Sequence, residues 1–325
     1  MARYRDSMPQ LGGGLFLTDG GIETTLIFQE GQDLPHFAAF PLLQTPQGTS
    51  ALRKYFHTYA DLAGRFNVGL ILESATWRAN SNWGDRLNYT PEALAGANRR
   101  AIQLLEEIRD SAVGFHPPMV ISGCIGPRGD GYVVDNAMST EEAEAYHQRQ
   151  IDTFADTQAD LVTAITMNYA DEAIGIAQAA RQASMPVVIS FTVETDGKLP
   201  STQSLADAIR QVDDATSGYP LYFMLNCAHP THFSDTVSVG EPWVDRICGL
   251  RANTSRMSHA ELDEAAELDV GDPIELGQQY AELKQHRLRR LNVLGGCCGT
   301  DQRHIGEIAE RCAPLFPKAG NQADA

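Results

Sequence analysis

Eight short apolar runs recur along the sequence, and each ends in polar residues or glycine. They are LFLTDGG (15–21), VGLILESAT (68–76), MVISGCIGP (119–127), ADLVTAIT (159–166), PVVISFTVE (186–194), LYFMLNCA (221–228), RICGLRAN (246–253) and LNVLGGCC (291–298). Runs of this kind are typical of strands that are buried on both faces of a parallel sheet. Most are separated by stretches with helical periodicity, such as SALRKYFHTYADLAGRF and IELGQQYAELKQH. Eight strands alternating with helices predict a (β/α)8 TIM barrel.

A length of 325 residues fits either two ordinary domains or one large barrel. The strand count favours a single domain over residues 1–325, with its core over about residues 11–315 and a polar tail over 316–325. The stretch between the sixth and seventh runs shows no convincing helical pattern, so we expect a short or irregular connection there. The segment 27–48, rich in Gln, Pro and Phe, is expected to be a long loop over the mouth of the barrel.

Helix starts agree with this organisation. Thr140, followed by Glu141 and Glu142, and Asp301, ahead of QRHIGEIAERC, are predicted N-caps. The scattered histidines lack ligand spacing, and most of them are expected at the surface. The acidic run at 259–269 is expected to be a solvated face.

The charge balance excludes two classes of partner. With 25 Lys and Arg against 42 Asp and Glu, the formal charge is -17, which disfavours binding to nucleic acid or to an anionic membrane. The N-terminus has no apolar core of signal-peptide length, and no run is long enough to span a bilayer. We therefore expect a cytoplasmic protein that acts on small molecules, and the sequence leaves its oligomeric state open.

Three of the six cysteines lie where a barrel of this class has its active site, at the carboxyl ends of the strands. Cys227 ends the sixth run, and the adjacent Cys297 and Cys298 end the eighth; Asp19 and Glu73 end the first and second. Three thiolates suit a soft or borderline ion such as Zn²⁺, which in a tetrahedral shell keeps one position for substrate. The flanking glycines 295, 296 and 299 would let the backbone turn so that both neighbouring sulfurs reach one ion.

Simpler interpretations of the cysteines remain open. Cys124, Cys248 and Cys312 are expected to be packed as small apolar side chains. For Cys297 and Cys298 the alternative to a metal is a vicinal disulfide switch. The chain would then be a redox-sensing barrel, or a thiol- or metal-binding barrel without catalysis.

The motifs resemble those of the homocysteine S-methyltransferase family, which includes the homocysteine-binding barrel of methionine synthase and betaine-homocysteine methyltransferase. The likeness extends from about residue 11 to 315, through DGGIETTL, LNCAHP and GGCCGT. It implies that Cys227, Cys297 and Cys298 are zinc ligands, and it adds Asn226 of LNCAHP to the expected substrate contacts. It also implies that Asp19 and the backbone of Gly20 and Gly21 hold the polar end of an amino-acid substrate.

The implied reaction is zinc-dependent transfer of a methyl group to a thiolate, with homocysteine giving methionine. Many members carry a glutamate on the fourth strand that binds the substrate ammonium, and Ile165 stands at that place here. Either Glu23 or Glu73 replaces it, or the acceptor is a thiol without an α-amino group. A third interpretation is that the alignment is displaced by a residue or two.

The second strand bears on the methyl donor. Trp77 and Trp83 could form an aromatic cage for a quaternary ammonium, whereas Arg78 between them would repel a cation if it faced the pocket. The chain has no length for a cobalamin- or folate-binding extension. A small sulfonium donor, S-methylmethionine or S-adenosylmethionine, is therefore preferred over a betaine-like donor.

Overall fold

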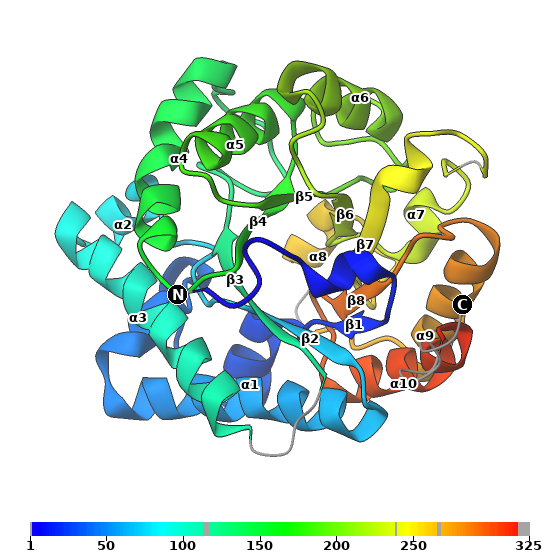
Figure 1. The fold of residues 1–325 in the computed structure, drawn as a ribbon, viewed down its shortest axis with the longest axis horizontal. Helices are drawn as coiled ribbons and strands as arrows, with labels where there is room; N and C mark the ends of the chain where they lie inside the picture. The colour runs from blue at the N-terminus through cyan, green and yellow to red at the C-terminus, as the bar shows by residue number, and fades with distance from the viewer. Residues whose placement is uncertain (1, 113–116, 238, 265–267, 318–325) are drawn as a thin grey trace.

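Eight parallel strands close into a barrel in sequence order, with β1 paired to both β2 and β8 (Figure 1). The computed structural model describes residues 2–112, 117–237, 239–264 and 268–317. The strands are β1 (Phe16–Leu17), β2 (Gly69–Glu73), β3 (Met119–Ile125), β4 (Leu161–Met167), β5 (Val187–Phe191), β6 (Phe223–Asn226), β7 (Ile247–Ala252) and β8 (Val293–Gly296). Seven lie within the predicted runs and β4 extends one residue past its run, at Met167, which confirms the (β/α)8 barrel.

Helices surround the barrel on its outer side (Figure 1). Within the described residues the α-helices are α1 (Pro46–Phe66), α2 (Ser81–Arg86), α3 (Pro91–Ser111), α4 (Thr140–Ala155), α5 (Ala170–Gln182), α6 (Leu205–Thr216), α7 (Pro230–Phe233), α8 (His259–Glu264), α9 (Pro273–His286) and α10 (Gln302–Cys312). Short 3₁₀-helical segments are η1 (Pro9–Gly12), η3 (Pro35–Phe37), η4 (Phe40–Gln44), η5 (Val244–Arg246) and η6 (Ala313–Leu315), and η2 (Thr24–Gln29) is a short π-helix. None of the described helices combines the length and apolar character that crossing a bilayer requires.

The helix starts were predicted to within one residue. Asp301 is the N-cap of α10, and its side chain accepts a hydrogen bond from the backbone N–H of Arg303. Thr140 is the first helical residue of α4 and not its cap. Ser139 takes that role in a capping box with Glu142, because its hydroxyl accepts from the N–H three residues later.

Two boundary regions test the predicted organisation. Between β6 and β7 the described residues form only the four-residue α7 and the single turn η5, as the missing helical pattern predicted. The predicted polar tail from residue 316 begins too early. Phe316 is buried against the core, where the ammonium of Lys284 lies 4.6 Å from its ring centroid. Residues 318–325 lie outside the described part of the chain.

The N-terminal segment closes the amino end of the barrel, and in Figure 1 it crosses the centre of the view in blue. Met8 packs with Phe16 and Ile71 on the barrel floor, and the backbone N–H of Tyr4 donates to Asp160 Oδ1 at 2.9 Å. The floor is therefore sealed, which leaves the carboxyl end of the strands for chemistry.

Candidate metal centre

The inward-facing side chains of the barrel change from apolar to polar along its axis. The lower layer consists of Phe16, Ile71, Val120, Leu161, Val188, Met224 and Val293. Side chains two positions apart on a strand face the same way, so the next layer consists of Glu73, Ser122, Thr163, Ser190 and Asn226. On β7, a Cβ at Gly249 would meet Met224, so Arg251 two residues later also faces inward. A buried polar layer thus lies directly beneath the carboxyl ends of the strands.

A cavity of about 330 Å³ opens above this layer. Phe28 and Phe37 line it from the segment 27–48, which confirms that this segment lies over the mouth of the barrel. Leu262 and Leu268 line it from the chain after β7. These apolar walls can exclude water from a reaction at the strand ends.

Three thiols meet at the edge of the cavity. The sulfur atoms of Cys227, Cys297 and Cys298 lie within 4.8 Å of one another, although the first belongs to the end of β6 and the others follow β8. The structure joins Cys227 to Cys297 as a disulfide, with Cα atoms 5.4 Å apart. This bridge joins the ends of two strands, and it differs from the vicinal Cys297–Cys298 pairing that was considered from the sequence. In the reduced state the three sulfurs form a donor set that fits a soft or borderline metal ion.

The backbone of Cys227 explains how its sulfur reaches the cluster. The residue has a left-handed conformation with φ of 53°, which is uncommon for a residue with a side chain. Its N–H donates to the carbonyl of Arg251 at 3.1 Å, and its own carbonyl accepts from Nε2 of His259 at 2.6 Å. The regular alternation of β6 ends here, and the side chain turns into the cavity.

The glycines around the adjacent cysteines act in two different ways. Gly299 has a φ of 80° and supplies the turn that was predicted. Gly296 is not left-handed, and a Cβ there would overlap the hydroxyl of Thr300. That hydroxyl donates to the carbonyl of Cys297 at 2.6 Å, so the close approach of Thr300 fixes the loop that carries both sulfurs.

Sequence reasoning missed two side chains that hold the cluster. Asn253, just after β7, accepts the N–H of Cys298 on its Oδ1 at 3.0 Å. His259, at the start of α8, contacts Glu194 at 3.1 Å and stacks on Tyr132 with ring centroids 4.0 Å apart. The described part of the run at 259–269 is therefore divided: Glu261 and Glu264 are exposed, as predicted for a solvated face, whereas His259 is buried at the site.

The histidines also differ from expectation. Within the described residues, four histidines are buried, although most were expected at the surface: His147, His229, His259 and His304. None of them joins the thiol cluster. The absence of ligand spacing agrees with their separation from the thiol cluster, but it carried no information on burial.

A buried ion pair occupies the first-strand side of the cavity. Asp19 Oδ1 lies 2.7 Å from Arg251 Nη2, and the hydroxyl of Tyr55 donates to Asp19 Oδ2 at 2.8 Å. Arg251 also donates to the carbonyls of Gly20 and Gly296, both at 3.2 Å. Arg251, a residue that sequence reasoning did not select, thus binds both Asp19 and the carbonyl of Gly20, two groups that were expected to contact substrate.

Two further carboxyl groups line the same cavity. Burial raises the pKa of Glu73 to about 7, against the opposing charge of Arg251 and the nearby hydroxyls of Ser122 and Thr163. Burial also raises the pKa of Glu23 to about 7. Burial raises the pKa of the Cys124 thiol well above its usual value, which keeps this side chain neutral and fits its predicted packing role.

Trp77, which follows β2, and Trp83, on α2, already hold a cation from the chain itself. The guanidinium of Arg78 lies 3.9 Å from the ring centroid of Trp77 and 3.7 Å from that of Trp83. It also donates to the carbonyl of Gly129 at 2.9 Å, and burial lowers its pKa to about 10, so it remains charged near neutrality. The aromatic faces considered for a quaternary ammonium are therefore occupied.

The remaining predicted site residues lie in different places. Gly21, Trp77 and Ile165 line the cavity. Asn226 is fully buried below it and binds neighbouring strands, since its Oδ1 accepts from Ser190 at 2.6 Å and its Nδ2 donates to Thr166 at 2.8 Å. Asn226 thus fixes β6 against β4 and β5.

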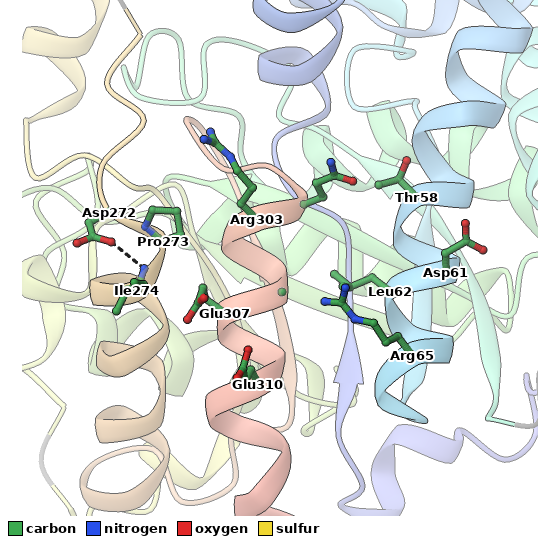
Figure 2. Close-up of a pocket in the computed structure, with 12 residues that line it drawn as sticks. Thr58, Asp61, Leu62, Arg65, Asp272, Pro273, Ile274, Arg303, Glu307 and Glu310 are labelled. Atoms are coloured by element: carbon green, nitrogen blue, oxygen red, sulfur yellow. Dashed lines mark hydrogen bonds between the residues drawn. The ribbon is translucent and has the colours of Figure 1, made fainter.

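A second hollow of about 720 Å³ lies on the outer surface between α1, α9 and α10 (Figure 2). Asp61 and Arg65 line it from α1, and Arg303, Glu307 and Glu310 line it from α10. Charges of both signs alternate along its walls. It lies on the helical layer outside the barrel, away from the strand ends that gather the thiols.

The fold and the cluster together define a class: a parallel (β/α)8 barrel with three cysteines at the carboxyl ends of two strands. The family model of homocysteine S-methyltransferase matches residues 16–312. The chain belongs to the homocysteine S-methyltransferase family.

Individual relatives are distant. The chain is 23% identical to betaine-homocysteine S-methyltransferase 1 of Bos taurus over 75% of its length, and 22% identical to the protein of that name from Rattus norvegicus. It spans 61% of the length of each of these curated relatives. Two solved structures of the homocysteine methyltransferase MmuM from Escherichia coli share the fold at 17% identity. The oxidized form has a TM-score of 0.70, covering 91% of this chain and 96% of that one, and the metallated form 0.69, covering 94% and 99%.

Proposed function

We propose that this protein is a zinc-dependent thiol S-methyltransferase whose acceptor is homocysteine, which it converts to methionine. The observation that carries the proposal is the convergence of Cys227, Cys297 and Cys298 beside a cavity with both charged and apolar walls. Family membership supports the reaction class. MmuM, which shares the fold, has been solved in a metallated form, and this agrees with a metal-dependent activity.

The residues present fit zinc. Three thiolates are a donor set that zinc accepts, and their number leaves room for one further ligand. When bound, zinc would supply the acceptor thiol in its deprotonated, nucleophilic form near neutral pH. The Cys227–Cys297 disulfide has to be reduced before the ion can bind, so we infer action in a reducing compartment such as the cytoplasm.

The chain's own residues then have two tasks. The charged groups beneath the cavity orient the acceptor, and the apolar walls from Phe28, Phe37 and Leu262 keep water away from the reacting atoms. The acceptor sulfur forms a bond to the methyl carbon as the bond from that carbon to the donor sulfur breaks, and the donor leaves as a neutral thioether. No general base is required once the acceptor has lost its proton.

The position of Arg78 bears on which methyl donor the site accepts. Because its guanidinium covers both tryptophan faces, a quaternary ammonium would have to displace a cation that is already bound. We therefore favour S-methylmethionine or S-adenosylmethionine over betaine. The reduced, zinc-loaded protein with homocysteine is expected to form methionine from a sulfonium donor at least about 100-fold faster than from betaine, as measured by mass spectrometry. Equal rates with betaine would contradict this donor assignment.

The observed disulfide favours one second candidate, a redox-sensing barrel. A sensor would lose and regain two hydrogens at Cys227 and Cys297 without zinc and without methyl transfer. The same assay separates the two functions, because methionine formation that requires both reductant and zinc supports the transferase.

A further inference from the structure

Resting on the proposed function, we propose that Glu73 binds the ammonium of the acceptor and Arg251 its carboxylate. The acceptor class is then an α-amino acid that carries a thiol. Both residues lie in the inward-facing polar layer, and both line the cavity that the three sulfurs border. Glu73 comes from β2 and Arg251 from β7.

Each of the two side chains holds a polar atom that the protein does not satisfy. Glu73 is 5% exposed and Arg251 is 6% exposed. Glu73 Oε2 and Arg251 Nη1 are buried and have no hydrogen-bond partner among the described residues. A buried polar atom without a hydrogen-bond partner lowers the stability of the fold by about 1–3 kcal/mol, and by more when the group is charged. Such atoms are therefore expected where a bound ligand supplies the missing hydrogen bond.

The other charged groups nearby are already committed. Asp19 is paired with Arg251 Nη2 and accepts from the hydroxyl of Tyr55. Arg78 lies between the two tryptophans. Asp19 Oδ1 also lacks a hydrogen bond, but it is engaged in the ion pair with Arg251. Glu73 Oε2 is therefore the deeply buried carboxylate oxygen with neither a hydrogen bond nor an ion pair among the described residues, whereas Glu23 is only half-buried.

The charges of Asp19, Arg251 and Glu73 together favour a zwitterionic ligand. Asp19 and Arg251 compensate each other, so an ionised Glu73 leaves a net negative charge in a site shielded from water, and an ammonium neutralises it. A carboxylate on the same ligand would accept a charge-assisted hydrogen bond from Arg251 Nη1. A thiol acid without an amino group would satisfy Arg251 and leave Glu73 unpaired.

The test compares two ligands that differ only in the amino group, homocysteine and 4-mercaptobutanoate. Each is titrated calorimetrically into the reduced, zinc-loaded protein. The wild type is expected to bind homocysteine about 10- to 100-fold more tightly, the range of a hydrogen bond between charged groups. Glu73→Gln should remove this preference and leave the affinity for 4-mercaptobutanoate within about twofold. The ratio of the two affinities does not depend on how much of a variant is folded.

Two further variants complete the design. Arg251→Lys should weaken both ligands by similar factors, because both carry the carboxylate. Glu172→Gln is the matched control: Glu172 is equally buried, but it lies on α5 and contacts His147 and the backbone of Arg128. It should preserve the wild-type preference.

Two results would overturn the assignment. One is a Glu73→Gln protein that keeps the wild-type preference for homocysteine, and the other is one that loses affinity for both thiols equally. If the wild type methylates homocysteine in either case, the proposed function survives and only the roles of Glu73 and Arg251 fail. If the zinc-loaded wild type binds neither thiol, both proposals fall together.

Discussion

Replacing Cys298 by serine is expected to lower the zinc affinity of the reduced protein by about 100-fold or more and to abolish methyl transfer at ordinary zinc concentrations. Structural zinc in four-ligand sites is bound with about 10–16 kcal/mol, or about 3 kcal/mol per ligand. A serine hydroxyl is a poor substitute for a thiolate at neutral pH. The measurement is competition against a chelator of known zinc affinity, followed by an assay of methionine formation.

Cys248→Ser provides the matched control for this prediction. Cys248 is a buried cysteine that packs in the barrel floor and lies outside the thiol cluster. Its replacement should leave zinc affinity unchanged. If Cys298→Ser retains both zinc and activity, Cys298 is no ligand and the proposed centre is wrong.

Replacing Glu73 by glutamine is expected to stabilise the fold at high pH. The pKa of Glu73 is about 7 in the folded chain against an ordinary value of 4.5, because burial disfavours its charged form. Ionised Glu73 therefore opposes folding. The cost is absent below about pH 4.5, grows as the pH rises to about 7, and is constant above, where it reaches about 3 kcal/mol.

The neutral glutamine removes this cost. At about pH 8, in urea unfolding of the reduced, metal-free protein, Glu73→Gln should exceed the wild type by about 2–3 kcal/mol in free energy of unfolding. Near pH 5 the two proteins should differ by under about 1 kcal/mol. Glu23 has a similarly raised pKa, but it is present in both proteins and cancels. If the free energies of unfolding of the two proteins differ by the same amount at both pH values, the ionised form of Glu73 is not destabilised in the folded protein.

The barrel was predictable because its strands are buried on both faces and appear as separate apolar runs. The meeting of the three cysteines was predictable for a related reason: strand ends of a parallel barrel share one face, so Cys227 and the Cys297–Cys298 pair lie at the same end of the barrel. The topology brings these positions together whatever the intervening sequence is.

The residues that the sequence did not reveal act through long-range contacts. Arg251 interrupts an otherwise apolar strand run, and that interruption was the one available signal that a charge is buried inside the barrel. His259 lies in an acidic stretch whose composition is typical of a solvated surface, and only the packing of α8 brings it to Cys227. The role of Arg78 depended on the direction of its side chain, which neither spacing nor composition determines.

The most direct test of the metal centre is zinc-edge X-ray absorption on the reduced, zinc-loaded protein, recorded without and with homocysteine. We predict three sulfur neighbours of zinc at about 2.3 Å, and a fourth when homocysteine is added. A shell made mainly of nitrogen and oxygen, or three sulfur neighbours that do not change with homocysteine, would contradict the proposal that Cys227, Cys297 and Cys298 hold the ion that receives the acceptor thiol.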